Sequence, residues 1–395
     1  INDLETNPYY PFLSEIKKNN LNSKNIQENF NKFRKKIVRE QIGIDEKKIV
    51  FIRHEDCHKF YGYFSQPSFI DNVLLFTLEG KGDDSSATVS IAKNNKIQEV
   101  YKTNDSNLGR LYRYITLLLG MKPCQHEYKV MGLAPYGTEF HGMRSLEHFR
   151  TFDLIKNTEI VNQKKHKDVY YSSRKILEGQ RFDGIAWGLQ KYTEEYMEKW
   201  ILNNVKKFKI NNIVISGGVA QNIKAMQVIK DNPLINSVWA GPISGDGSLA
   251  IGAAWAVASK FPDNINGIES IYLGTKINDN DIKKSLAHIS NKYDVIDNYK
   301  IKDVAKWIFE GKILARCEGR MEFGQRALGN RSILADPRKF DTVERINKKI
   351  KYRDFWMPFT PSICYEGCDN YLENNKQVYS PFMTMAFDLK EEMSS

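Results

Sequence analysis

The chain has 395 residues, of which 41% are hydrophobic, and it carries a formal net charge of +10. This length is enough for about two or three domains with sizeable cores, and no apolar run of about 18 residues is present to span a membrane. The five cysteines are few and scattered, which disfavours a disulfide scaffold and favours a cytoplasmic location. The positive charge lies in Asn/Lys-rich stretches such as 16–36, where aromatics do not interleave regularly, so we expect no nucleic-acid partner.

In chain order, the polar region 1–48 is predicted to be helical. Its apolar residues are spaced for partial burial of one face: Phe12, Ile16, Phe30, Phe33 and Ile37. A strand is expected at 49–53, followed by a helix that begins near His54. The apolar run 72–78 predicts a strand, and the glycine-containing turn after it leads into a second strand at 87–92, which is the layout of a hairpin.

The middle of the chain predicts alternating helices and strands. A long amphipathic helix at 184–208 precedes a strand at 212–216, and a turn at Gly217-Gly218 leads into a helix at 220–230. A buried, small-residue-rich helix is expected at 248–259, and 264–280 is expected to be a crossing linker. This alternation predicts an α/β fold.

His54 and His58 are four residues apart, so a helix would place both imidazoles on one face, where they could share a metal ion. Two ligands are one short of a typical site, and such pairs also occur incidentally on helices. The pair alone leaves both interpretations open.

The Gly217-Gly218 turn joins a predicted strand to a predicted helix. In this layout glycines let the backbone approach a nucleotide, and the helix N-terminus faces phosphate. A tight strand-to-helix turn without a ligand would explain the same residues.

The segment Cys317–Arg338, here called the arginine loop, is rich in glycine and arginine. These residues are Gly319, Gly324, Gly329, Arg320, Arg326, Arg331 and Arg338. Glycines let backbone N–H groups approach a ligand, and guanidinium groups match phosphate or carboxylate oxygens two at a time. We interpret the segment as an anion-binding loop, with a basic surface turn as the alternative. Cys364 and Cys368 are interpreted as buried thiols, because no second Cys/His pair accompanies them.

Four groups of residues resemble, in order, the motifs of the O-carbamoyltransferase family, which includes nodulation and antibiotic-type carbamoyltransferases. They are RHEDCH at 53–58 with EGKGD at 79–83, EYKVMGLAPYG at 127–137, SGGVAQN at 216–222 with PISGDGSLAIGAA at 242–254, and EFGQRALGNRS at 322–332. Gln325 stands where the family usually has Pro, and Met357 stands in place of an Arg in the similar segment KYRDFWMPFTPS at 351–362. The resemblance covers roughly residues 45–365.

The resemblance implies an actin-like ATPase domain of the sugar-kinase type over 1–298, followed by the start of a YrdC-like α/β domain over 299–395. It also implies that family segments precede Ile1 and follow Ser395, so we expect the chain to be incomplete at both ends.

The same resemblance implies the roles of individual residues. His54, His58, Asp246 and Glu79 would hold a divalent metal, expected to be Fe²⁺, with Glu79 in place of the family's Asp. The implied nucleotide-binding residues are Gly217, Gly218, Asn222, Lys129 and Gly132. The implied carbamoyl phosphate or carbamoyl adenylate ligands are Arg320, Arg326 and Arg331. The catalytic base is unknown.

The implied reaction uses ATP, with Mg²⁺, and carbamoyl phosphate to form carbamoyl adenylate, and passes the carbamoyl group to a hydroxyl of a glycan or other small-molecule acceptor. Two alternatives are a threonylcarbamoyl-adenosine tRNA transferase-like enzyme and a degenerate nucleotide-binding module. The arginine loop argues against the first, and the residues His54, His58 and Asp246 argue against the second. The sequence leaves the acceptor and the oligomeric state open.

Overall fold

The computed structural model describes residues 23–68, 70–261, 265, 267–289, 292–296, 298–339 and 341–393. The chain divides into two compact units, Ile1–Arg53 and His54–Ser395. The first unit holds helix α2 (Ser23–Ile42) and the 3₁₀ helix η1 (Glu46–Lys48).

Helix α2 confirms the helical prediction for its part of the chain, and Phe30, Phe33 and Ile37 are half-buried as expected. Phe12 and Ile16 lie outside the described residues. The strand expected at 49–53 is wrong, because these residues have no regular structure and pair with no described strand.

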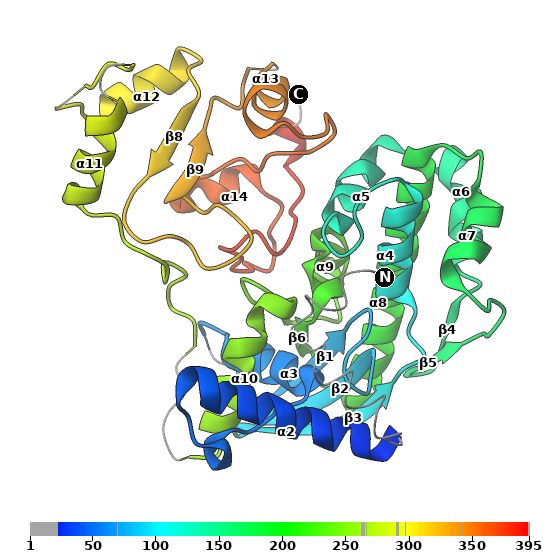
Figure 1. Cartoon of the computed structure of the whole chain (residues 1–395). Coiled ribbons are helices and arrows are strands. Elements are labelled where there is room, and N and C mark those ends of the chain that lie inside the picture. The colour runs from blue at the N-terminus through cyan, green and yellow to red at the C-terminus, as the bar shows by residue number, and fades with distance from the viewer. Residues whose placement is uncertain are drawn as a thin grey trace, which may run out of the picture. The chain divides into compact units, whose positions relative to one another are not determined.

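The second unit is built on a five-stranded mixed sheet of order β3-β2-β1-β6-β7 (Figure 1). Its strands are β1 (Val73–Leu78), β2 (Ala87–Lys93), β3 (Lys96–Thr103), β6 (Asn212–Ser216) and β7 (Ser237–Trp239). Strands β1, β2 and β3 are antiparallel neighbours, whereas β6 is parallel to β1 and β7 is parallel to β6. The predicted hairpin is confirmed, and β3 extends it by a strand that the sequence analysis missed.

Helices cover both faces of β1, which explains why its sequence, VLLFTL, is apolar except for Thr77. Leu74 and Phe76 belong to a core shared with α4 (Leu108–Leu118), α8 (Phe182–Phe208) and α9 (Ile223–Asp231). Val73 and Leu75 belong to the core of the opposite face, shared with α3 (His54–Phe64) and α10 (Leu249–Ala258). The period of two along a strand assigns neighbouring side chains to these opposite cores.

Helix α8 is a 27-residue helix that packs against α6 (Glu139–Phe149). Glycines permit this close approach, since a Cβ at Gly142 would lie 2.3 Å from the Trp187 ring and one at Gly184 would lie 2.4 Å from the His141 carbonyl oxygen. The surrounding elements are α5 (Glu127–Leu133), η2 (Ala134–Tyr136), β4 (Asp153–Lys156), β5 (Glu159–Asn162) and α7 (Val169–Leu177).

The predicted α/β fold class is confirmed, with changes in its details. The helix expected at 184–208 is α8, and the helix expected at 220–230 divides into the 3₁₀ helix η3 (Gly218–Gln221) and α9. The helix expected at 248–259 is η4 (Asp246–Ser248) followed by α10, and only Gly252 and Ala256 of α10 are buried. The expected burial of this helix is therefore largely wrong, because α10 packs on α3 along one side.

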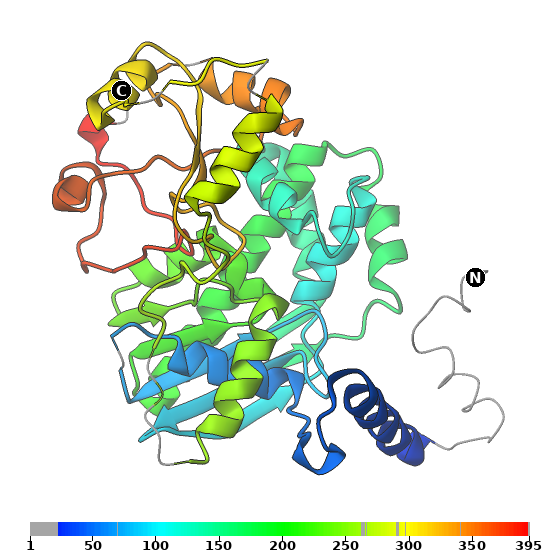
Figure 2. The ribbon, with the colours of Figure 1, turned by 60° about the vertical axis from the view of Figure 1, so that its left-hand side comes forward.

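Beyond α10, residues 267–278 have no helix or strand, in keeping with the expected linker, and α11 (Asp279–Ile289) begins inside its predicted end. The arginine loop begins at the end of β8 (Leu314–Cys317) and contains β9 (Arg331–Leu334), with residues 318–330 joining the two strands, in the yellow-to-red part of Figure 2. The remaining elements are α12 (Ile301–Phe309), α13 (Thr342–Arg345), the π-helix η5 (Ile346–Lys351), η6 (Tyr365–Gly367), α14 (Cys368–Tyr371) and η7 (Glu391–Met393).

The expected domain boundary at residues 298 and 299 stays a prediction. The interpretation of Cys364 and Cys368 as buried thiols is wrong, because Cys364 is exposed and Cys368, at the start of α14, is half-buried. None of the described helices combines the length and the apolar character that crossing a membrane requires.

Candidate functional site

Four side chains from three separate segments meet beside the end of β1. His54 and His58 lie on the first two turns of α3, Glu79 directly follows β1, and Asp246 begins η4. Their possible ligand atoms all lie within 4.8 Å of one another. The structure therefore brings together all four residues that the sequence analysis assigned to a metal; we call them the metal cluster.

The distances within the metal cluster fit the shell of a single small cation. The His54 and His58 Nε2 atoms are 3.1 Å apart, and His58 Nε2 is 2.9 Å from Glu79 Oε1. Asp246 Oδ1 lies 3.5 Å from His54 Nε2 and 3.6 Å from His58 Nε2. With metal–ligand bonds of about 2.0–2.2 Å, neighbouring ligands lie roughly 2.8–3.6 Å apart. Two imidazoles and two carboxylates are a donor set that suits iron, manganese or zinc.

The metal cluster has a buried and an open side, since the His58 side chain is 0% exposed whereas that of Asp246 is 72% exposed. Burial lowers the pKa of His58, but the interactions with the Asp246 and Glu79 carboxylates outweigh it and raise this pKa to about 9. The nearby His58 imidazole lowers the pKa of Asp246 in turn. A bound cation would replace the proton that these carboxylates stabilise.

Two acidic residues that the sequence analysis did not single out position the cluster. The Asp83 carboxylate accepts a hydrogen bond of 2.8 Å from the backbone N–H of His54 at the start of α3. Glu55 Oε1 accepts from the N–H groups of Asp84 and Ser85 at 2.9 and 2.8 Å. These bonds tie the loop after β1 to the histidine helix. Both residues lie inside the motifs that carry the ligands, Glu55 in RHEDCH and Asp83 in EGKGD, and this was the signal in the sequence.

The glycine turn, Gly217-Gly218, lies against the metal cluster. Gly217 has a φ of +97°, and its N–H donates to the Ser244 carbonyl at 2.7 Å. The Gly218 N–H donates to Glu79 Oε1, and a Cβ at Gly218 would lie 3.1 Å from Glu79 Oε2. The glycines therefore allow the turn to approach a cluster carboxylate, and their role toward a nucleotide stays a prediction.

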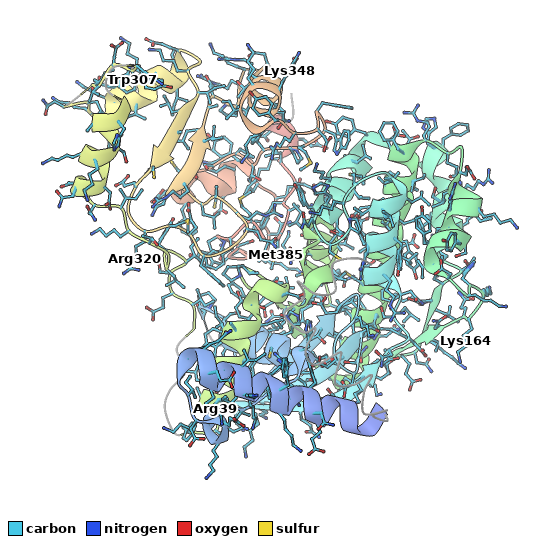
Figure 3. All side chains as sticks on the ribbon, viewed as in Figure 1. Arg39, Lys164, Trp307, Arg320, Lys348 and Met385 are labelled. Atoms are coloured by element: carbon cyan, nitrogen blue, oxygen red, sulfur yellow. The ribbon has the colours of Figure 1, made fainter. Side chains whose placement is uncertain are left out.

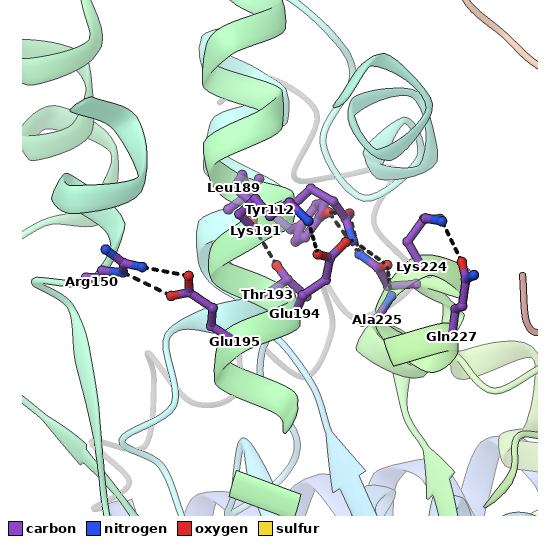
Figure 4. Close-up of polar contacts among 12 residues, drawn as sticks. Tyr112, Arg150, Leu189, Lys191, Thr193, Glu194, Glu195, Lys224, Ala225 and Gln227 are labelled. Carbon is purple, nitrogen blue, oxygen red and sulfur yellow. Dashed lines mark hydrogen bonds and ion pairs between the residues drawn. The ribbon is translucent and has the colours of Figure 1, made fainter. Parts of the chain in front are cut away.

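Asn222 is the N-cap of α9 and sits in a buried hydrogen-bond network, of which Figure 4 labels the partners Tyr112 and Ala225. Its Oδ1 accepts from the Ala225 N–H and from Gln190 Nε2, each at 3.0 Å. Its Nδ2 donates to the Tyr112 hydroxyl and to Gln190 Oε1, each at 2.9 Å. These contacts give Asn222 a structural role as the cap of α9. Its contact with a nucleotide stays a prediction.

Lys129 and Gly132, the other predicted nucleotide residues, lie on α5 against the segment 351–362. Lys129 Nζ is 2.9 Å from Asp354 Oδ2, and the Lys129 carbonyl accepts from Trp356 Nε1 at 3.2 Å. A Cβ at Gly132 would lie 3.5 Å from Pro358 Cδ. Two motifs that are distant in sequence therefore contact each other here.

The arginine loop is folded around an internal carboxylate. Glu322 Oε1 accepts hydrogen bonds from the N–H groups of Leu328, Asn330 and Arg331 at 3.0, 2.7 and 3.0 Å. Burial raises the pKa of Glu322, and the backbone hydrogen bonds outweigh this and lower it overall. The backbone donors of the loop are therefore occupied by a carboxylate of the protein itself, and the predicted binding of an external anion stays a prediction.

Two of the three predicted phosphate-binding arginines have partners within the chain. Arg320, labelled in Figure 3, donates to the carbonyls of Leu273 and Gly274 at 3.3 and 3.2 Å. Arg331 donates to the carbonyls of Glu318 and Asn330 at 2.8 and 2.9 Å. These contacts brace the loop. Arg326 lines a pocket together with Ala220 and Gln221 of η3.

Comparison with known proteins agrees with the resemblance. The family description "Carbamoyltransferase N-terminus" matches residues 6–255, and "Carbamoyltransferase C-terminus" matches residues 305–395. The chain belongs to the carbamoyltransferase family.

Several relatives match most of the chain. The uncharacterized protein MJ1051 of Methanocaldococcus jannaschii is 34% identical over 87% of this chain and 67% of its own length. Nodulation protein NolO of Bradyrhizobium diazoefficiens is 28% identical over 86% of this chain and 63% of its own. Nodulation protein NolNO of Sinorhizobium fredii is 26% identical over 88% of this chain and 52% of its own. The chain thus spans between about half and two thirds of the length of these relatives.

Proposed function

We propose that the chain is part of an O-carbamoyltransferase in which His54, His58, Glu79 and Asp246 hold one divalent metal ion. The observation that carries this proposal is the convergence of four ligand atoms within 4.8 Å from three segments. The family membership supports it, because both family descriptions match the chain.

We propose Fe²⁺ as the metal, because two histidines with carboxylates are a ligand set that suits Fe(II). When bound, a divalent ion supplies a Lewis acid that polarises an oxygen of the acceptor or of the carbamoyl group. The chain's own residues hold the site in place: Asp83 fixes the start of α3, and Gly218 holds Glu79. The exposed side of Asp246 leaves room for an acceptor to approach.

The carbamoyl group would come from carbamoyl phosphate, activated with ATP and Mg²⁺ as carbamoyl adenylate, and the acceptor would be a hydroxyl of a glycan or secondary metabolite. We further propose an actin-like domain around the mixed sheet, a YrdC-like domain that begins near Tyr299, and a cytoplasmic location, which the five free cysteines support.

The metal assignment is tested by metal analysis of the purified chain and of a His54→Ala, His58→Ala double variant. We expect one divalent ion per chain in the parent protein and its loss in the variant. A His126→Ala, His141→Ala double variant removes two histidines outside the metal cluster and is expected to keep the metal. Unchanged metal content in the first variant would contradict the assignment.

The transfer reaction is tested on a longer form of the protein, incubated with ATP, carbamoyl phosphate and hydroxylated acceptors. We expect release of AMP and a mass gain of one carbamoyl group on an acceptor, both dependent on His58. Transfer that persists in the metal-free double variant would show that the metal cluster is not the transfer site.

A further inference from the structure

A groove lies between the end of α4, the helix α7 and the start of α8, all labelled in Figure 1. We call it the α7 groove. Its volume is about 550 Å³, within the range of roughly 300–1,000 Å³ that is usual for small-ligand sites. None of its lining residues belongs to the metal cluster or to the motifs that carry the family resemblance. The groove is therefore a separate feature of the molecule that the proposed chemistry does not use.

The inner part of the α7 groove is apolar, and two aromatic rings line it. Leu177 is only 1% exposed, whereas Phe182, at the first position of α8, is 53% exposed. The Tyr170 ring is held by the Tyr114 ring, whose centroid is 6.4 Å away at an interplanar angle of 60°. A ligand with a flat apolar face can bury that face against these rings, which is favourable.

The rim of the α7 groove carries charges of both signs. Arg174 of α7 and Glu178, which directly follows α7, are exposed, and neither side chain forms a hydrogen bond or ion pair with a described residue. The Gln180 amide, in contrast, is already bonded to the Ser145 hydroxyl and the Ile176 carbonyl, each at 2.8 Å. The free groups at the rim are thus one donor and one acceptor. Their opposite charges suit a neutral ligand with hydroxyl groups better than an anion or a cation.

Further aromatic rings continue from the groove over the surface. The Phe182 ring centroid lies 6.4 Å from that of Trp356, Trp356 lies 5.1 Å from Phe355, and Phe355 lies 6.0 Å from Tyr136. Phe355 and Tyr136 are 66% and 52% exposed. We call these four rings the aromatic row. Contiguous exposed apolar groups of this kind mark binding surfaces. The row extends the α7 groove through Phe182, which belongs to both.

We propose that the α7 groove and the aromatic row bind a neutral oligosaccharide. A sugar ring has a face of C–H groups, which can pack on Tyr170 or Phe182, and a rim of hydroxyls, which can accept from Arg174 and donate to Glu178. Further sugars of the same chain can stack along the aromatic row. A lipid tail would leave the charged rim without partners, and a phosphate would meet the Glu178 carboxylate. The role of the bound sugar as an acceptor rests on the proposed function, whereas its binding does not.

The experiment is calorimetric titration of the 395-residue chain with neutral tetrasaccharides of glucose, mannose, galactose or N-acetylglucosamine in separate arms. We expect binding in at least one arm. In Phe182→Ala we expect the affinity for that sugar to fall about tenfold or more, because the ring belongs to both the groove and the row. Arg174→Gln keeps a donor at the rim, so its loss of affinity is expected to be smaller. Phe182 is more than half exposed, so its truncation is expected to leave the fold intact.

Phe140→Ala is the matched control, because it removes a phenyl ring that is 90% exposed at the start of α6 and does not line the groove. It is expected to bind the sugar as the parent chain does. The His54→Ala, His58→Ala double variant is also expected to keep parent-like affinity for the sugar, because the α7 groove shares no residue with the metal cluster.

No binding in any arm, or parent-like affinity of Phe182→Ala for the bound sugar, would overturn the inference. Sugar binding that depends on His54 and His58 but not on Phe182 would assign the sugar to the metal cluster and overturn it too. Self-association of the parent chain that Phe182→Ala abolishes, without sugar binding, would identify a second copy as the occupant and likewise overturn it. Sugar binding lost in Phe182→Ala, together with no carbamoyl transfer by a longer form of the protein, would support the inference and contradict the proposed function.

Discussion

At the scale of single residues, the metal cluster depends on one carboxylate with two partners. Glu79 Oε1 lies 2.9 Å from His58 Nε2 and also accepts from the Gly218 N–H. The longer arm of Glu, compared with the family's Asp, reaches both groups. The glycine turn and the metal cluster are therefore linked through Glu79, although they belong to different sequence motifs.

The first prediction concerns Gly218→Val. Its Cβ would stand 3.1 Å from Glu79 Oε2, and the branched methyl groups would push the carboxylate away from His58. We expect metal affinity to fall about tenfold or more, as happens when outer contacts of a metal ligand are removed. The left-handed backbone that would strain a substitution lies at Gly217, whose φ is +97°, and not at Gly218.

The measurement is metal content and metal affinity by competition with a chelator. Gly367→Val is the control, because the nearest atom to its Cβ, at 3.8 Å, is the end of the Tyr371 side chain. Equal metal affinity in Gly218→Val and the parent chain would contradict the coupling of the turn to the cluster.

At the scale of elements, a buried histidine links α6 to α7. His148 Nε2 lies 3.1 Å from the Ser173 hydroxyl, and the His148 and His166 ring centroids are 5.3 Å apart. Burial, with a smaller contribution from His166, lowers the pKa of His148 from its ordinary 6.5 to about 4. The folded chain therefore holds this imidazole neutral.

The second prediction is a loss of stability in acid. Between pH 6.5 and about 4, the unfolded chain binds a proton at His148 that the folded chain does not. Protonation of His148 therefore costs no stability above pH 6.5, and the free energy of unfolding falls as the pH is lowered through this range. The shift of the His148 pKa from 6.5 to about 4 corresponds to a loss of roughly 3 kcal/mol in the free energy of unfolding. The Gln side chain of a His148→Gln variant can still form hydrogen bonds but cannot be protonated. We therefore expect the free energy of unfolding of this variant to depend less on pH in this range than that of the parent chain.

Denaturant unfolding at several pH values provides the measurement. His141→Gln, on the same helix, removes a histidine outside this pair and is expected to keep the pH slope of the parent chain. An unchanged slope in His148→Gln would show that other groups govern the acid response.

At the scale of the whole molecule, the C-terminal segment is held against α9. Lys376 Nζ donates to the carbonyls of Lys230, Asn232 and Ile235, and the Ala386 N–H donates to the Ile223 carbonyl at 3.2 Å. Met385, labelled in Figure 3, belongs to the core shared with α8 and α9. The two family-matching stretches are therefore joined by contacts at both ends of α9.

The third prediction is that Lys376→Met loosens this junction. The variant keeps an apolar stem but leaves carbonyls at the end of α9 without their cationic donor, and lost hydrogen bonds to a charged group cost about 1.5–3 kcal/mol. We expect faster hydrogen exchange over residues 374–390. Lys348→Met, which removes an exposed lysine of η5, is the control and should exchange as the parent chain does. Parent-like exchange in Lys376→Met would contradict the assigned role.

Much of the local structure was predictable because it depends on short-range spacing. The four-residue spacing of His54 and His58 specifies one helical face, and the apolar run at 72–78 specifies a strand buried on both faces. Strand β3 was missed because its side chains are mostly half-exposed and show no apolar run. The expected strand at 49–53 failed because a strand also needs a partner, which no local pattern supplies.

The sequence by itself determined the family, the α/β class and the residue types of the metal cluster, since these depend on motif order and on local periodicity. Only the tertiary structure decided which charged groups already have partners. Glu322 occupies the backbone donors of the arginine loop, Asp83 holds the start of α3, and Arg326 alone among the loop's arginines lines the pocket with no bond to the described chain. The reason is physical: the availability of a charge depends on groups far away in sequence that folding brings within hydrogen-bond distance.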